Sequence, residues 1–393
     1  MAFFRMTSFA FFLTLTVSCQ PNSKNGLSTG KGTGDVQRLL YVANDSTAQI
    51  DVFDINDNHT KIRSFDASAN TGTGPMRYRG LSAHPGTARL YLSDSNFGVV
   101  AAYDLLTDSL IWVKKYDTCP FPDRINVNRN GTAVFVPCKM EPEHHMVIDA
   151  NTGDILNTYD MAHFPHNTFV GEQGKYMYLS AYRNPVVYAV EQNTFEKVKE
   201  ITGFVNDIGS GVRPFSVDEG EQFLFATEND KLGFGVGDIE KGQQIFYVPQ
   251  VTPSERTQYP AAEAPRPHGG QPPSHGMAVR PGSKEVWFLD DAWGYLYVYD
   301  TSPLYQDPPQ VPVFKTQVPL FEDITKVWTE TRWRWVAMSA DGKFVYPASG
   351  IVVDGDTKQR LPFKITPSEK LVEIQFENGR PIRVSGQNGG VYN

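Results

Sequence analysis

The chain has 393 residues, of which 40% are hydrophobic and 20% charged, a balance that suits a globular protein with a substantial core. Its formal net charge of −8 argues against a general role in nucleic-acid binding. Tyrosine, phenylalanine, glycine and proline are all plentiful, which favours strands separated by tight turns.

The first twenty residues, MAFFRMTSFAFFLTLTVSCQ, predict a targeting segment. One early cation, Arg5, precedes an apolar run over 7–17, which is too short to span a bilayer and is typical of a signal peptide at 1–19. Ordinary cleavage before Gln20 competes with lipidation of Cys19, for which TVSC would serve as a bacterial lipobox. The threonine three residues before this cysteine favours ordinary secretion, because a lipobox prefers leucine there.

The remainder of the chain is expected to consist of a flexible segment at 20–36 and one large domain at 37–393. No segment of that domain is apolar enough to predict a stable membrane span. Without Cys19 the cysteine count is even, as is common in an oxidising compartment. Three Asn-x-Ser/Thr sequons predict glycosylation and weakly favour a eukaryotic glycoprotein: Asn44, Asn58 and Asn130.

A repeated pattern organises the large domain. Six runs of eight residues each end in a turn glycine: RGLSAHPG (79–86), RINVNRNG (124–131), NTFVGEQG (167–174), RPFSVDEG (213–220), HGMAVRPG (275–282) and WVAMSADG (335–342). A second apolar run follows each glycine, and most units show a third and a fourth run. Four short antiparallel strands per unit, at a period of about 45 residues, predict a β-propeller.

The two ends of the chain are expected to complete the ring. The segment RLLYVANDSTAQIDVFDIND (38–57) begins at the second-strand pattern and lacks a first strand of its own. The C-terminal segment KLVEIQFENGRPIRV (370–384) can supply it. We therefore expect an all-β fold, a seven-bladed β-propeller with four antiparallel strands per blade. Closure by the N- and C-terminal strands would remove exposed sheet edges.

The repeat resembles the YVTN-type propeller family, whose second-strand pattern reads YVAN (41–44) here. The resemblance covers essentially the whole mature chain and implies the fold, but this fold hosts unrelated chemistries. Four segments are similar to a subgroup of secreted bacterial and fungal propellers: PHNTF (165–169), VRPFSV (212–217), PSHGMAV (273–279) and EKLVEIQFENGRPIRV (369–384). Fungal members include the hetero-Diels–Alderases of tropolone-sesquiterpenoid biosynthesis. Fold, size and secretion match those enzymes, whereas no catalytic motif matches residue by residue.

The residue that begins the first strand of each blade is expected at the mouth of the central channel. Counting seven residues back from each turn glycine gives Arg79, Arg124, Asn167, Arg213, His275 and Trp335. The positions before them hold Tyr78, Asp123, His166, Val212, Ser274 and Arg334. Such residues could merely hydrogen-bond neighbouring blades in a wet channel. We favour a polar ligand pocket, because convergent polar groups in a concave site are typical of one.

Two long connections are expected to overhang this mouth. The spacing of the turn glycines rises to about 60 residues in the last two units, which predicts inserts at 252–274 and 303–334. The second contains Tyr305, Phe321, Trp328 and Trp333, and a proline-rich, aromatic composition suits a shaped lid.

The two cysteines are expected on the same side of the ring. Cys119 precedes the first strand of its blade and Cys138 ends the second strand, so the pattern predicts a disulfide between them. This disulfide would brace the loop that carries Asp123 and Arg124.

Most histidines also map to the mouth: His144, His145, His163, His166, His268 and His275, with His59 and His84 at the other face. Their spacing matches no metal motif and no carboxylate cluster joins them, so no metal is expected. The charged segment KMEPEHHM (139–146) predicts that His144 and His145 are solvated. Nucleophile-elbow, P-loop and dinucleotide motifs are missing, and no cofactor is expected.

Arginines suit oxyanions, histidine can move a proton near neutral pH, and aromatic rings accept hydrocarbons. The predicted catalytic residues are Arg79, Arg124, His166, Arg213 and His275. The predicted substrate-binding residues are Tyr78, Asp123, Asn167, Trp328, Trp333, Arg334 and Trp335.

Three functions are compatible with this site. The resemblance implies an intermolecular hetero-Diels–Alder cyclisation between a tropolone-type quinone methide and an alkene such as humulene. The alternatives are a lyase or lactonase acting on a carboxylated substrate, and a non-catalytic binding propeller that is secreted or lipid-anchored. The expected partners are small molecules, anionic or oxygen-rich with an apolar co-substrate, and not nucleic acid.

Overall fold

The computed structural model describes residues 36–68, 77–160, 163–204, 211–228, 231–251, 274–290, 294–321, 335–386 and 390–393. The chain divides into two compact units, 1–33 and 34–393. The first unit lies outside the described residues, and so does the predicted signal peptide with Cys19. None of the described helices is long and apolar enough to cross a membrane.

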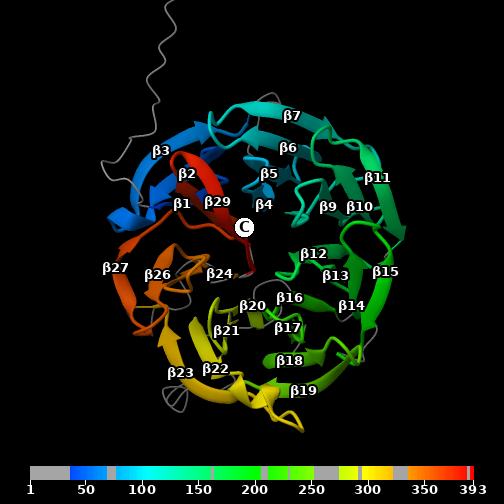
Figure 1. Ribbon diagram of the computed structural model, residues 1–393, viewed down its shortest axis with the longest axis vertical. Coiled ribbons are helices and arrows are strands. Elements are labelled where there is room, and N and C mark those ends of the chain that lie inside the picture. Colours follow the sequence, from blue (N-terminus) through cyan, green and yellow to red (C-terminus); the bar gives the residue numbers. More distant parts are fainter. Residues whose placement is uncertain are drawn as a thin grey trace, which may run out of the picture. The chain divides into compact units, whose positions relative to one another are not determined.

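The described strands of the second unit form seven antiparallel sheets arranged as a ring (Figure 1). The first three are β4 (Tyr78–His84), β5 (Arg89–Asp94), β6 (Val99–Asp104), β7 (Leu110–Lys115); β8 (Asn126–Val127), β9 (Ala133–Cys138), β10 (His144–Asp149), β11 (Ile155–Asp160); β12 (Pro165–Val170), β13 (Tyr176–Ala181), β14 (Asn184–Glu191), β15 (Lys197–Ile201). The next three are β16 (Val212–Val217), β17 (Phe223–Glu228), β18 (Gly233–Asp238), β19 (Gln243–Pro249); β20 (Ser274–Val279), β21 (Glu285–Asp290), β22 (Tyr295–Asp300), β23 (Val313–Pro319); β24 (Val336–Met338), β25 (Phe344–Pro347), β26 (Ile351–Asp354), β27 (Arg360–Lys364). The predicted seven-bladed propeller is thereby confirmed.

The pattern of burial explains why the repeat is visible in the sequence. The second strands β9, β13 and β17 are buried at every position, because neighbouring blades cover both of their faces. The outermost strands are partly exposed, and most residues of β11 alternate between exposed and partly buried positions. The second strands therefore appear as largely apolar runs, whereas the outermost strands carry polar residues.

The ring closes through the two ends of the chain. β28 (Leu371–Glu377) pairs antiparallel with β1 (Gln37–Asn44), which continues into β2 (Gln49–Asp54) and β3 (Thr60–Asp66). At this joint the Arg38 guanidinium donates to Glu373 Oε1 at 2.8 Å and to both carboxylate oxygens of Asp341 at 2.8 Å. The prediction that the C-terminal segment supplies the missing first strand is confirmed.

The C-terminal segment contains more than the single strand expected. It continues as β29 (Arg380–Ser385) and β30 (Val391–Tyr392), which extend the closing sheet to six strands in the order β3-β2-β1-β28-β29-β30. The turn between β28 and β29 is Asn378-Gly379, and both residues have positive φ, 51° and 74°. An Asn-Gly pair is a strong sequence signal for a two-residue hairpin turn, and the turn between β28 and β29 has this signal.

The last residues of the chain lie in the centre of the ring (Figure 1). The Tyr392 hydroxyl donates to the carbonyl of Ala83 at 2.7 Å, and the Val391 N–H donates to Glu172 Oε1 at 2.9 Å. Ala83 lies near the end of the inner strand β4, and Glu172 just beyond the end of β12. The C-terminus therefore occupies the end of the channel at which the inner strands finish, which leaves a mouth where they begin.

The predicted insert at 303–334 is partly wrong. The 3₁₀ helix η4 (Ser302–Tyr305) only turns the chain from β22 into β23, the fourth strand of that blade. Tyr305 donates its hydroxyl to Asp218 Oδ2 at 2.9 Å, next to the finishing end of β16, so it lies away from the mouth. Phe321 packs on Tyr295 with 5.1 Å between ring centroids. The remaining insert residues, 252–273 and 322–334, lie outside the described residues.

Glu172 makes the docking of the C-terminus dependent on pH. Burial raises the pKa of Glu172 to about 7, although the Val391 N–H opposes the shift. A raised pKa means that the folded state keeps its proton up to neutral pH, so this contribution to stability is lost as pH rises towards 7. Glu172→Gln keeps an acceptor oxygen without the charge. We expect its thermal unfolding midpoint to match the wild type near pH 4.5 and to exceed it at pH 8. An equal difference at both pH values would contradict this assignment.

Candidate functional site at the channel mouth

Four inner strands carry a bulge close to where they begin. Their pairing with the second strand shifts register between Tyr78 and Gly80, Pro165 and Asn167, Val212 and Phe215, and Ser274 and Met277. The residues inside these bulges include Arg79, His166, Arg213 and His275. A bulge bends its strand and re-aims the side chain. This local irregularity directs four predicted residues towards one point.

These four residues and Arg124 line a single cavity of about 200 Å³. The structure thus brings together all five residues predicted to be catalytic. The rest of the described lining consists of Arg77, Lys139, Phe164, Tyr182 and Glu369. Lys139 and Tyr182 directly follow the second strands β9 and β13, and Glu369 precedes β28. Sequence reasoning missed them because it considered only the beginnings of the first strands of the complete blades.

Arg213 is buried yet incompletely bonded. Its side chain carbon Cζ lies 3.6 Å from the centroid of the Tyr182 ring. Its Nη1 is 3.4 Å from His166 Nε2 and 3.5 Å from His275 Nε2, whereas Nε and Nη2 make no hydrogen bond. Burial lowers the pKa of Arg213 to about 10, so the group stays charged at neutral pH. None of the ion pairs found in the described part of the chain includes it.

A glycine permits this stacking. A Cβ atom on Gly211 would lie 2.1 Å from the carbonyl oxygen of Tyr182, so no other residue fits there without moving backbone. The chain that enters β16 can therefore run against the turn after β13. This close approach places the Arg213 guanidinium on the Tyr182 ring.

Asp123 anchors one side of the cavity from below. It is fully buried, 2.8 Å from Arg79 Nη2 and 3.7 Å from both Lys139 Nζ and His166 Nε2. Burial alone would raise the pKa of Asp123, but the cations Arg79 and Lys139 hold it well below its usual range. Asp123 is therefore a fixed negative charge.

Arg124 anchors the opposite side. Its Cζ lies 3.3 Å from the centroid of the Trp335 ring, and its Nη2 donates to Glu369 Oε2 at 2.6 Å. Burial lowers the pKa of Arg124 to about 10, against the effect of Glu369. Burial would raise the pKa of Glu369, but Lys370, Arg124 and Arg79 hold it well below its usual range. This pair is thus fully ionised.

His166 is a neutral imidazole of defined tautomer. Burial lowers its pKa well below 6.5; Asp123 opposes the shift, while Lys139 and Arg213 add to it. Its Nδ1 is hydrogen-bonded to Asn167 Oδ1, and since an amide oxygen only accepts, Nδ1 carries the proton. The lone pair on Nε2 is therefore available beside Arg213.

Lys139 is the titratable cation of the cavity. Burial lowers its pKa to about 8, in the direction that Arg79, Arg213 and Arg124 also push, whereas Asp123 opposes the shift. Its Nζ lies 5.7 Å from the centroid of the Tyr182 ring. Lys139 is mostly protonated at neutral pH, and it stands near the ring on which Arg213 stacks.

The predicted substrate-binding residues fall into different places. Tyr78 is fully buried in the hydrophobic core and is not among the described lining residues. Asn167 supports His166, and Trp335 supports Arg124. Trp328, Trp333 and Arg334 lie outside the described residues.

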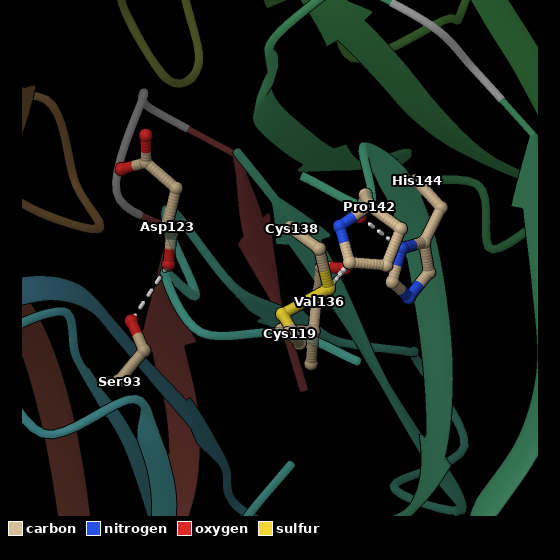
Figure 2. The surroundings of a disulfide bond; sticks show 7 residues. All are labelled: Ser93, Cys119, Asp123, Val136, Cys138, Pro142 and His144. Carbon is tan, nitrogen blue, oxygen red and sulfur yellow. Dashed lines mark hydrogen bonds between the residues drawn. A yellow bond between two sulfur atoms is a disulfide. The ribbon is translucent and has the colours of Figure 1, made fainter. Parts of the chain in front are cut away.

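One expectation about the remaining histidines is wrong. His145 is completely buried in β10 instead of solvated, and burial lowers its pKa to about 3. His144 is partly exposed, and its Nδ1–H donates to the carbonyl of Pro142 at 2.7 Å (Figure 2). His268 lies outside the described residues. Among the residues that the structure describes, no three His, Cys, Asp or Glu side chains are grouped as metal ligands.

The predicted disulfide is confirmed. Cys119 and Cys138 are bonded, with 5.0 Å between their Cα atoms, and Figure 2 shows them beside the loop of Asp123. That loop is held further by the Asp123 N–H, which donates to the Pro137 carbonyl at 2.8 Å. Ser93 also donates its hydroxyl to the Asp123 carbonyl at 2.6 Å. The disulfide therefore braces the loop that carries Asp123 and Arg124.

Of the three predicted glycosylation sites, Asn58 and Asn130 are exposed, whereas Asn44 is half-buried and donates to Asp51 Oδ2 at 3.0 Å. Their glycosylation stays a prediction.

Comparisons with known proteins identify the fold. No family model and no curated protein matches the chain. Dihydro-heme d1 dehydrogenase NirN in complex with DHE matches with a TM-score of 0.57 and 12% identity, over 90% of this chain and 74% of that chain. The structure of U3-55K and the RRP9 WD40 repeats match with a TM-score of 0.59 each, at 9% and 8% identity. They cover 84% and 83% of this chain, and 89% and 86% of their own chains. These likenesses and the ring of seven sheets define the fold as a seven-bladed β-propeller.

Removal of the disulfide should destabilise the protein measurably. A cross-link between residues 19 positions apart restricts the unfolded chain and contributes about 3 kcal/mol. We expect the double variant Cys119→Ser, Cys138→Ser to lose about that much unfolding free energy in urea titrations. A reducing agent should destabilise the wild type equally and leave the variant unaffected. Identical urea midpoints for the wild type and the variant would refute the bracing role.

Proposed function

We propose that the protein is an enzyme that binds a carboxylated small molecule in the channel-mouth cavity and moves a proton of that molecule, as lyases and lactonases do. The observation that carries this proposal is the state of Arg213. It is a buried cation with unused donors, and its Nη1 lies within 3.5 Å of two imidazole nitrogens. An anion-binding group and a proton acceptor are thus held at one point.

The binding step would use the guanidinium of Arg213. Its Nε and Nη2 are buried donors without a hydrogen-bond partner, and a carboxylate that reached them could accept from both in parallel. The guanidinium stays charged and is held flat on the Tyr182 ring, so little side-chain entropy is lost on binding. Arg124 and Lys139 would add donors to negative charge that develops during reaction.

The proton would pass to His166 Nε2. Without a ligand, His166 is a weak base, because burial and the surrounding cations depress its pKa. A bound carboxylate adds a negative charge beside the imidazole and raises that pKa towards neutrality, where general-base catalysis is most effective. A proton on the carbon next to the carboxylate would be the one within reach. The electron pair of the broken C–H bond would move into the enediolate of the bound carboxylate and then form the new double bond as the substituent on the following carbon leaves.

The hetero-Diels–Alder cyclisation implied by the resemblance to YVTN-type propellers is a second, narrower candidate. It would use the same donors to polarise the oxygens of a quinone methide, and it needs an apolar wall for the alkene. Phe164 and Tyr182 are the aromatic members of the described lining, whereas Trp328 and Trp333 lie outside the described residues. A cavity of about 200 Å³ suits one small acid better than a tropolone and a terpene together.

We also propose that the protein works outside the cytoplasm. A disulfide suits an oxidising compartment, and the sequence of residues 1–19 predicts export. Mass spectrometry of the native N-terminus would separate cleavage before Gln20 from lipidation of Cys19. Absence of turnover with intact ligand binding would favour the non-catalytic alternative.

Two substitutions separate binding from proton transfer. We expect Arg213→Met to weaken binding of small carboxylates by about 100-fold, since it removes charge-assisted hydrogen bonds. We expect His166→Asn to retain binding and to lower turnover by about 100-fold or more. Calorimetry measures the first effect. The second needs ultraviolet detection of the new double bond, or of lactone opening, with uronic oligosaccharides and muconolactone-type acids.

Arg89→Met is the matched control for the loss of a cation. Arg89 begins β5 and pairs with His84 at the end of the channel away from the mouth. Its Nη1 donates to the Ala150 carbonyl at 2.9 Å. This variant should bind and react like the wild type. Failure of the wild type to bind any carboxylate, or unchanged binding by Arg213→Met, would rule out the proposed function.

A further inference from the structure

Among the described residues, the cavity holds more buried positive charge than its carboxylates neutralise. Four cations contribute side chains that are at most 19% exposed: Arg79, Arg124, Lys139 and Arg213. Within the described part of the chain, the carboxylates in ion-pair contact with them are Asp123 and Glu369. Arg77 is exposed and screened by solvent. The nearby Lys370 lies 3.8 Å from Asp45 Oδ2 and 3.7 Å from Glu369 Oε2, so it shares Glu369 with Arg124.

The excess can be assigned to two particular side chains. Asp123 lies 2.8 Å from Arg79 and 3.7 Å from Lys139, so Arg79 is its main partner. Glu369 accepts from Arg124 at 2.6 Å. Lys139 therefore has only the longer contact with Asp123, which it shares with Arg79. Arg213 has no ion pair among the described residues. Both cations lie near the Tyr182 ring, with Arg213 Cζ 3.6 Å and Lys139 Nζ 5.7 Å from its centroid.

Uncompensated charge in a buried site is costly, because the protein interior solvates ions poorly. The depressed pKa values of Lys139, about 8, and Arg213, about 10, report this cost. Two negative charges placed beside these side chains would remove it. The volume of about 200 Å³ corresponds to roughly seven waters at about 30 Å³ each, which suits a short molecule with an anionic group at either end.

We infer that the natural ligand is a small dicarboxylate, held by Arg213 at one carboxylate and by Lys139 at the other. This inference rests on the proposed function and adds the second anionic group and the residue that selects it. A rigid guanidinium fork suits one planar carboxylate, and the flexible ammonium group can follow the other. Lys139 is thus the specificity-determining residue of the cavity.

Calorimetry with three probes tests the inference: succinate, butyrate as the monocarboxylate of equal length, and glycerol 3-phosphate as a dianionic phosphate ester. We expect succinate to bind the wild type about 10- to 100-fold more tightly than butyrate, because the second carboxylate gains a charge-assisted hydrogen bond. Lys139→Met should reduce this ratio to about one. Lys139→Arg keeps the positive charge and should retain most of the ratio of succinate affinity to butyrate affinity. This variant replaces Lys139→Met in the experiment if Lys139→Met does not fold.

The outcomes separate this inference from the proposal on which it rests. Equal binding of succinate and butyrate by the wild type would overturn the dicarboxylate and leave the proposed function standing. Tighter binding of glycerol 3-phosphate than of succinate would also overturn it, in favour of a phosphate ester. A succinate preference that survives in Lys139→Met would overturn the role of Lys139. Binding of none of the carboxylates would overturn the proposed function as well.

Discussion

The pairing of β1 with β28 is the constraint on which the site depends. This pairing joins residues from opposite ends of the chain, and Arg38 reinforces it through Glu373 and Asp341. Closure removes the sheet edge that β1 would otherwise expose. It also brings Glu369, immediately before β28, to Arg124, which is 245 positions away in the sequence. One of the two carboxylates of the cavity is therefore present only when the ring is closed.

The mouth is built where inner strands depart from regular pairing with the second strand. Other strands pair in register and pack buried side chains between blades, as β9 does with β10. At the mouth, bulges turn Arg79, His166 and Arg213 out of that pattern and into a buried cavity. Local violations that a large surrounding core can support are typical of functional sites. The unmatched charge of Arg213 is the clearest violation among the described residues.

The fold could be predicted from the sequence because its inner strands are buried on both faces and repeat at a regular spacing. The turn glycines fixed the register, and counting from them located Arg79, Arg124, Arg213 and His275. Residues outside that count were not found. Lys139 and Tyr182 directly follow second strands, and they reach the mouth from outside the first strands on which the count was based.

Two errors have a common physical origin in composition. The fourth strand β23, VFKTQVP, is half exposed and carries polar residues, so it was not distinguished from the insert at 303–334. His145 lies in a charged segment, yet the first residues of β10 already belong to a buried third strand. In both cases local polarity is a poor measure of exposure, because the position of the strand within its blade decides burial.

The C-terminus and the cavity lie at different ends of the channel. Tyr392 and Val391 are hydrogen-bonded at the end where the inner strands finish, whereas the cavity lies where they begin. In the proposed function the cations of the cavity would have two effects. They would attract an anion, and they add to the effect of burial, which holds the pKa of His166 well below 6.5. The negative charge that would satisfy Arg213 and Lys139 would then also raise the basicity of His166. Binding of the ligand and activation of the base would be one electrostatic event, which a neutral molecule of the same shape could not bring about.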